Sequence, residues 1–200
     1  MLTHSYRKAT EEIAFRRGHL KRSIFSQKIE VVLALVGSRD DLPSYLGSIP
    51  FLFKASAMVL LAGGCAILVR AAAIPGFRAR PIVALWPTIL FLLTAVVLDQ
   101  SGLPLTGVHP PLSATACVGT IIAASLPAIG LIVAALRRGT PTKLRQAGFF
   151  AGLLAGALGA MVYSVFCEND GAAFVALWYS LAVVIVGCIG AVLGPKWLAW

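Results

Sequence analysis

Five apolar runs, each close to the length of a membrane-spanning helix, constrain the fold of this 200-residue chain more than any other feature. A helix needs about 20 apolar residues to cross the hydrocarbon core of a bilayer. Because a backbone in lipid must satisfy its own hydrogen bonds, and the runs show no strand-like alternation, we expect helices. The sequence therefore predicts an all-α, polytopic membrane helix bundle. The runs cover residues 51–69, 82–98, 115–136, 147–166 and 174–193.

The composition agrees with this class. Hydrophobic residues make up 58% of the chain and charged residues 12%, whereas a soluble domain carries about 25% charged residues. The formal net charge is +9, but the basic residues lie between the apolar runs, where membrane proteins use them to fix orientation. We therefore expect a lipid bilayer as partner and no direct nucleic-acid binding. Nucleotide-binding and nucleophile-elbow motifs are absent from the sequence, so we do not expect an enzyme.

Lys and Arg alternate between the connections. The connection 70–81 holds three of them and 137–146 holds four, whereas 99–114 and 167–173 hold none. Positive charge is retained in cytoplasmic loops. The pattern therefore predicts that the connections 70–81 and 137–146 and the C-terminus are cytoplasmic, and that the connections 99–114 and 167–173 lie outside.

The N-terminal segment requires one more crossing. Residues 1–28 are strongly basic and are expected to form a cytoplasmic tail, with residues 29–200 as the transmembrane domain. Five spans alone would place this tail outside. A sixth, less apolar span over about 24–38 resolves the conflict, although it brings Lys28 and Glu30 to the membrane edge. The alternative is five spans and a helix lying on the membrane surface.

Small residues predict close helix packing. Gly148, Gly152 and Gly156 recur at every fourth position, and Gly190 and Gly194 repeat this spacing in the last run. Glycine at this spacing allows two helix backbones to approach closely. We expect these faces to pack against each other within one chain.

The four cysteines separate by side under the six-span topology. Cys117 and Cys167 fall at the outer ends of their helices, and Cys65 and Cys188 fall toward the cytoplasm. The outer pair could form a disulfide, bind a soft metal as thiolates, or be two small buried side chains. Residues in the outer connections that could complete a metal site are His109, Glu168 and Asp170.

Two further charged residues lie at outer helix ends. We expect Asp99 to be a helix-end residue rather than part of a proton relay. Lys54 is expected to extend its ammonium toward the outer membrane interface, as long basic side chains near helix ends do.

Several blocks of the sequence resemble one known family. They include residues 136–142 (LRRGTPT), 147–153 (AGFFAGL), 174–182 (FVALWYSLA) and 190–200 (GAVLGPKWLAW). Together they are similar to the NrsF-type membrane anti-sigma factors, the negative regulators of the extracytoplasmic-function sigma factor SigF in proteobacteria. The resemblance covers about residues 38–200.

This resemblance implies a six-span protein of the bacterial inner membrane with both ends cytoplasmic. It implies that the protein holds an extracytoplasmic-function sigma factor and releases it under heavy-metal or oxidative stress. Cys117 and Cys167 match the sensing cysteines of the family, so the expected cofactor is at most a transient heavy-metal ion. Phe166 stands where the family usually has His. Neither the sigma-binding surface nor the oligomeric state follows from the sequence.

The alternative functions are a membrane thiol oxidoreductase and a small transporter. An oxidoreductase would be expected to have a closely spaced cysteine pair that exchanges with a partner thiol. A transporter would be expected to have charged residues lining a path through the membrane. The sequence shows neither feature clearly.

Overall fold

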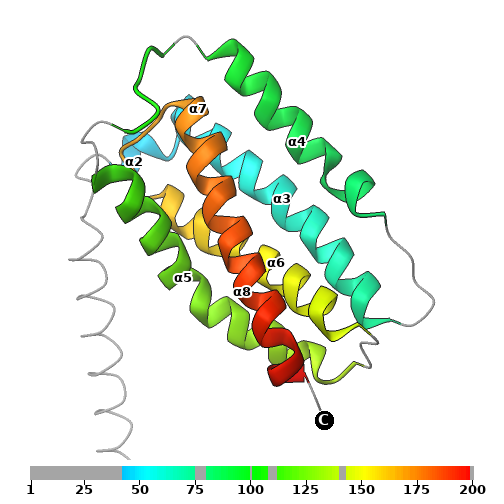
Figure 1. The fold of residues 1–200 in the computed structure, drawn as a ribbon. Coiled ribbons are helices and arrows are strands. Elements are labelled where there is room, and N and C mark those ends of the chain that lie inside the picture. Colours follow the sequence, from blue (N-terminus) through cyan, green and yellow to red (C-terminus); the bar gives the residue numbers. More distant parts are fainter. Residues whose placement is uncertain (1–41, 75–79, 100, 108–111, 140–142, 199–200) are drawn as a thin grey trace, which may run out of the picture. The chain divides into compact units, whose positions relative to one another are not determined.

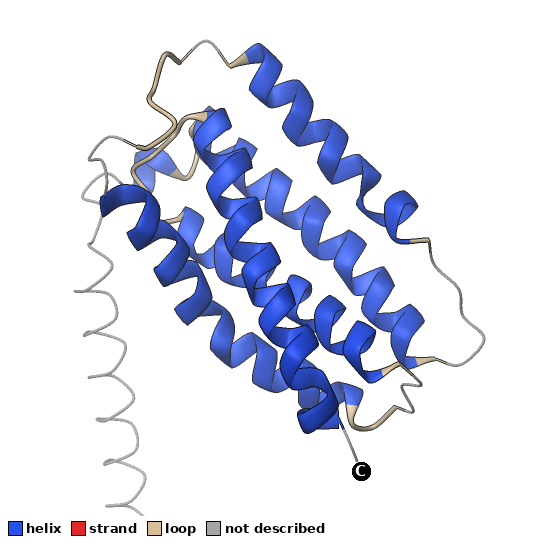
Figure 2. Cartoon of the chain, in the orientation of Figure 1, coloured by secondary structure: helices blue, strands red, loops and turns tan. Residues whose placement is uncertain are grey.

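The computed structural model describes residues 42–74, 80–99, 101–107, 112–139 and 143–198, and these parts contain helices and no strand (Figures 1 and 2). The expected tail (1–28) and first span (24–38) lie outside the described residues. The long helices are α3 (Ile49–Ala73), α4 (Pro81–Leu98), α5 (Leu112–Leu136), α6 (Leu144–Ser164) and α8 (Ser180–Leu198). Three short elements are α2 (Leu42–Tyr45), α7 (Ala172–Phe174) and the π-helical η1 (Val175–Tyr179).

Four helices are long and apolar enough to cross a membrane. They are Ile49–Ala73, Ala114–Leu136, Leu144–Ser164 and the continuous segment Ala172–Trp197 that joins α7, η1 and α8. The apolar part of α4 is shorter, Val83–Leu98. The prediction of an all-α fold is therefore confirmed for the described residues, and four of their helices have the length and composition that spanning requires. Six spans would require both α4 and a segment before residue 42 to cross, and that number stays a prediction.

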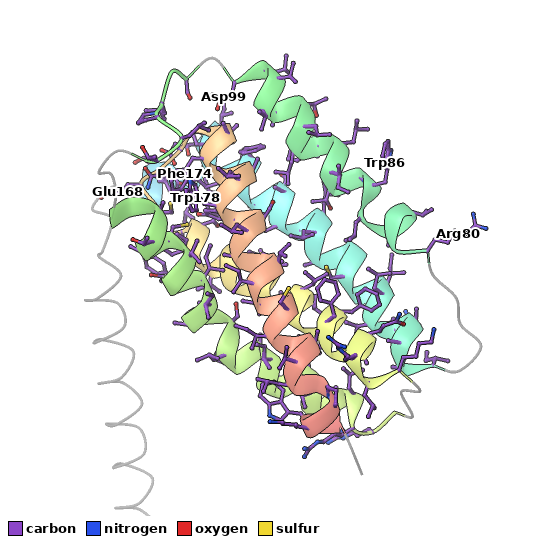
Figure 3. The ribbon with its side chains drawn as sticks, viewed as in Figure 1. Arg80, Trp86, Asp99, Glu168, Phe174 and Trp178 are labelled. Carbon is purple, nitrogen blue, oxygen red and sulfur yellow. The ribbon has the colours of Figure 1, made fainter. Side chains whose placement is uncertain are left out.

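The described charges separate to the two ends of the bundle. One end, here called the acidic end, carries every described carboxylate: Asp99, Glu168 and Asp170. The other, here called the basic end, carries every described Lys and Arg except Lys54. Figure 3 shows α4 running from Arg80 to Asp99 between these ends. The exposed residues of the basic end are Arg70, Arg80, Arg137, Arg138, Lys143, Arg145 and Lys196.

Local sequence signals explain where several helices begin and bend. The Ser48 hydroxyl accepts the Phe51 N–H at 3.4 Å and caps α3. Pro81 opens α4, where the missing N–H of proline has no cost. Pro87 and Pro127 lie inside α4 and α5, as the sequence predicts, and each removes one helical hydrogen bond.

Helices α6 and α8 form the closest contact of the bundle. A Cβ added to Gly148 would overlap the Gly190 carbonyl oxygen and would lie 2.8 Å from the Gly194 Cα. The same holds for Gly152 against Val186, and Gly156 lies against Val183. The expectation that the spaced glycines pack together within one chain is confirmed. Backbone meets backbone here, so a methyl group has no flexible neighbour to displace.

We expect Gly148→Ala to lower the free energy of unfolding by about 1–3 kcal/mol, because the added methyl forces α6 away from α8. Gly130→Ala in α5 is the matched control, since its added Cβ meets nothing within 4 Å. That variant should be as stable as the native protein or slightly more so, because alanine favours helix. Unfolding in detergent micelles, followed by circular dichroism, measures both. Equal stability of the two variants would contradict the close-contact argument.

Candidate functional site

Cys117 and Cys167 come together at the acidic end. Cys117 lies in the first turns of α5, and Cys167 lies in the turn that follows α6. Their exposed fractions are 0% and 2%, and both belong to one cluster of buried residues that pack together. The expectation that these two cysteines share one end is therefore confirmed. Because the two thiols lie in the same cluster, a disulfide or a soft metal bound by both thiolates is chemistry open to the pair.

Two tyrosines line the cysteine pair. Tyr163 in α6 and Tyr179 at the end of η1 have ring centroids 5.9 Å apart. Tyr179 is fully buried, and its hydroxyl makes no hydrogen bond by ordinary distance criteria among the described residues. Tyr179 belongs to the same buried cluster as Cys117 and Cys167. A π-helical turn changes the direction of the side chains that follow it, and such turns often lie at functional sites.

Lys54 is buried beside this pair instead of reaching the membrane interface. Its side chain has an exposed fraction of 0%. The Nζ atom donates to Asp170 Oδ1 at 2.7 Å, to the Cys167 carbonyl oxygen at 3.0 Å and to the Tyr45 hydroxyl at 3.0 Å. The expectation of an interfacial ammonium is therefore wrong. The physical reason is that all three N–H donors of the ammonium find acceptors inside the bundle.

Tyr45 ties the short helix α2 to the same cluster. Its hydroxyl lies 3.2 Å from Asp170 Oδ1 and 3.4 Å from the Ser164 carbonyl oxygen. Burial raises the pKa of the Tyr45 phenol, so this hydroxyl keeps its proton at neutral pH and donates it to one of these two oxygens. Tyr45 therefore accepts from Lys54 and donates to the end of α6 or to Asp170.

The surroundings of Cys167 favour its thiolate. The Cys117 side chain, as a hydrogen-bond partner, is the strongest influence that lowers the pKa of the Cys167 thiol, and the nearby Lys54 ammonium adds to it. Burial acts in the opposite direction and is outweighed. The thiolate is the form of cysteine that reacts with oxidants and binds metals.

Glu168 and Asp170, the two expected metal ligands among the described residues, do not complete a metal site with the pair. Asp170 is paired with Lys54, and Glu168 is exposed at the acidic end (Figure 3). His109 lies outside the described residues. Within the described parts of the chain, no group of three or more His, Cys, Asp and Glu side chains could hold a metal ion. A metal site completed by these residues stays a prediction.

The remaining cysteines lie elsewhere. Cys65 is fully buried in the middle of α3. Cys188 is exposed on α8. Cys65 and Cys188 therefore provide a buried and an exposed control for substitutions of Cys117 and Cys167.

Comparison with known proteins places the chain in a family. A family model described as "Negative regulator of sigma F", NrsF, matches residues 18–200. The chain belongs to the NrsF family. It is 31% identical over 179 residues to the probable anti-sigma-F factor NrsF of Azospira oryzae, covering 85% of this chain and 82% of that relative.

A second NrsF relative supports the assignment over a shorter stretch. The anti-sigma-F factor NrsF of Caulobacter vibrioides is 39% identical over 84 residues, which is 42% of this chain and 39% of that protein. No solved structure matches the chain.

Three tyrosines of the site, Tyr45, Tyr163 and Tyr179, were not predicted as site residues in this NrsF-family chain, and Lys54 was predicted to reach the membrane interface. Lys54 carries a usable signal, because an ionisable residue inside a span usually faces the bundle interior and has a partner. Tyr45, Tyr163 and Tyr179 carry no such signal, since tyrosine is common at membrane interfaces. Their place in the site depends on how the helices pack.

Asp99 joins two helix ends near the site. Its Oδ1 atom accepts the Ser101 N–H at 3.0 Å, and its Oδ2 atom accepts the Ala173 N–H at 3.0 Å. Asp99 thus ends α4 and caps the first turn of the last helix, as its expected role as a helix-end residue implies. Hydrogen bonds from Ser101, followed by that from the Ala173 backbone, lower the pKa of Asp99.

We expect Asp99→Ala to destabilise the protein at pH 7 by about 1 kcal/mol, the usual cost of losing a helix cap. A carboxyl group with a lowered folded-state pKa stabilises the fold above its unfolded pKa of about 4 and loses this effect below it. The stability difference between native and variant protein should therefore shrink as the pH falls from 5 to 3, roughly the range around that pKa. Unfolding in detergent across this range measures it. A difference that does not change with pH would contradict the role of the charged carboxylate.

Proposed function

We propose that this protein is an anti-sigma factor of the bacterial inner membrane. It binds an extracytoplasmic-function sigma factor on the cytoplasmic side and releases it when heavy metal or an oxidant acts on Cys117 and Cys167. Membership of the NrsF family and the names of both relatives support the anti-sigma activity. The observation that carries the sensing role is the burial of these two cysteines, which come from different elements, in one cluster.

A chemical change at this pair alters helix packing. Cys117 belongs to α5, whereas Cys167 follows α6. A disulfide or a shared metal ion would fix the end of α6 against α5. Because the surroundings of the pair are close-packed, neighbouring helices would have to move when this bond forms. Such a change regulates a partner only if the partner binds the two states with different affinity. The proposed release therefore requires that the sigma factor prefer the state with two thiols.

Either an oxidant or a soft metal would suit the pair. Two thiols with one favoured as thiolate are suited to disulfide formation, and thiolates also prefer soft metal ions. Oxidation needs no further ligand. Metal binding would recruit one more donor, for which the candidates remain Glu168, Asp170 and His109.

The charge separation supports an orientation. The basic end, with its seven exposed Lys and Arg side chains, would face the cytoplasm. The acidic end, with the cysteine pair, would then face the outside, and both termini would be cytoplasmic. In this orientation the sensing site and the sigma factor lie on opposite sides of the membrane.

We expect Cys117→Ser and Cys167→Ser each to abolish the induction of sigma-dependent transcription by cadmium or diamide. Serine removes the thiol chemistry at almost unchanged size. The measurement is a promoter reporter in cells that contain the cognate sigma factor. Cys65→Ser is the buried control and Cys188→Ser the exposed control, and both should respond as the native protein does. Normal induction in the Cys117 and Cys167 variants would disprove the sensing role.

Co-purification separates sensing from binding. Membranes that contain the native chain should retain the sigma factor, and treatment with diamide should release it. The Cys117→Ser protein should retain the sigma factor with and without diamide. If well-folded native protein retains no sigma factor, the anti-sigma activity itself is wrong.

Reporter fusions test the orientation. Alkaline phosphatase, which is active only outside the cytoplasm, should be active when fused after residue 105 and inactive when fused after residue 139. Fusions at residues 1 and 45 should show opposite sides if the chain also crosses between them, since six spans require this. Activity on the same side at residues 1 and 45 would favour five spans and a surface helix.

A further inference from the structure

Lys54 is the one described cation within the apolar part of the bundle, and the proposed cysteine chemistry does not by itself explain it. Burying an ammonium has a cost of several kcal/mol unless it is paired and fully hydrogen-bonded. All three donors of Lys54 are used, and the acceptors come from α2, from the Cys167 backbone and from Asp170. The ammonium therefore joins α3 to α2, nine residues away, and to the turn of Cys167 and Asp170, which lie 113 and 116 residues away.

The contact to the Cys167 carbonyl is the informative one. Asp170 alone could neutralise the Lys54 charge, and it is itself part-exposed, with a relative side-chain exposure of 26%. The ammonium nevertheless also binds the backbone of Cys167, which shares a buried cluster with Cys117. Asp170 lies three residues further along the same turn. Lys54 thus binds the turn that carries Cys167 at two points, the Cys167 carbonyl oxygen and the Asp170 carboxylate.

We propose that Lys54 is a positioning residue for the cysteine pair: by binding the Cys167 carbonyl and Asp170 together, it holds the Cys167 sulfur against Cys117. The inference rests on the proposed sensing role of that pair. Tyr45 supports the ammonium from α2 through its hydroxyl and through its ring, whose centroid lies 5.6 Å from Nζ. Within the same turn, Glu168 is exposed, and its carboxylate is not an acceptor of the Lys54 ammonium.

Disulfide formation reports this positioning directly. The azo oxidant diamide takes two electrons and two protons from the Cys117 and Cys167 thiols; the S–S bond forms and the N=N bond becomes an N–N bond with two N–H groups. The rate depends on how often the two sulfur atoms meet in a reactive geometry. A turn that is no longer held by Lys54 spreads the Cys167 sulfur over more positions, so the disulfide should form more slowly.

The decisive variant removes both charges together. Lys54→Met and Asp170→Asn each leave one partner uncompensated, and each should lower the unfolding temperature, the Asp170 variant more because it strands the fully buried ammonium. The double variant Lys54→Met/Asp170→Asn removes both charges of the Lys54–Asp170 pair and should regain most of this stability. We expect it nevertheless to form the Cys117–Cys167 disulfide at least about fivefold more slowly than the native protein.

The measurement uses purified full-length protein in detergent micelles. Samples are treated with diamide, quenched with an alkylating reagent under denaturing conditions, and analysed by mass spectrometry for the peptide that links Cys117 and Cys167. Glu168→Gln is the matched control, because it removes a neighbouring carboxylate that does not contact Lys54, and its rate should equal the native rate. A double variant with native stability and native rate would show that Lys54 and Asp170 serve stability alone and would overturn the proposal.

Tyr45→Phe provides a second, milder test. It keeps the buried ring and removes the hydroxyl that accepts from Lys54 and also contacts Asp170 and the Ser164 carbonyl oxygen. We expect a reduction of about twofold or more in the rate, and a native rate would count against the proposal. Because no sigma factor is present, these rates test the positioning alone. If the variants form the disulfide at the native rate while release of the sigma factor still depends on the cysteines, only this inference is rejected. If release of the sigma factor does not depend on the cysteines, the proposed function is rejected.

Discussion

The close contact between α6 and α8 is the constraint on which the rest of the bundle depends. Gly148, Gly152 and Gly190 let the two backbones meet without intervening side chains. Helix α6 also packs against α5 and α3, and it is the most deeply buried of the four candidate spans. The turn that carries Cys167 follows directly from this central helix. Its position is therefore fixed by the glycine contact below it and by the polar cluster around it.

A polar cluster in an apolar bundle has a thermodynamic cost, and this one is organised to limit it. The Lys54 ammonium has three acceptors, and Tyr45 supplies the next hydrogen bond outward. A fully satisfied network of this kind adds little net stability compared with apolar packing, but it favours a single arrangement of its members. Tyr179 is the exception, since its buried hydroxyl lacks a hydrogen-bond partner among the described residues, in the same cluster as Cys167. Specificity of geometry, rather than stability, is what the cluster contributes.

The sequence predicted the features that arise from periodicity and composition. Apolar run lengths located the five long helices to within a few residues at most ends, glycine spacing identified the α6–α8 contact, and charge alternation brought Cys117 and Cys167 to one end. It failed for Lys54, because the direction of a side chain depends on an acceptor 116 residues away, Asp170. The π-helical turn before Tyr179 was missed for a similar reason: no residue type in that turn demands the extra residue, and packing against neighbouring helices selects it.

The proposed function requires an effect at the acidic end to reach the basic end, and rigid helices already connect the two. The turn after Cys167 leads into α7, which Asp99 fixes to the end of α4. From there one continuous helix, Ala172–Trp197, passes Tyr179 beside the cysteine pair and crosses the bundle along α6. At the basic end the Arg137 Nε atom donates to its Trp197 carbonyl oxygen at 2.6 Å. Because backbone contacts between α6 and α8 leave no compressible layer, a shift of one helix end cannot be absorbed locally. The sensing site at one end and the partner-binding site at the other can therefore be coupled through the packed helices α6 and α8, because each site can shift the position of this helix pair.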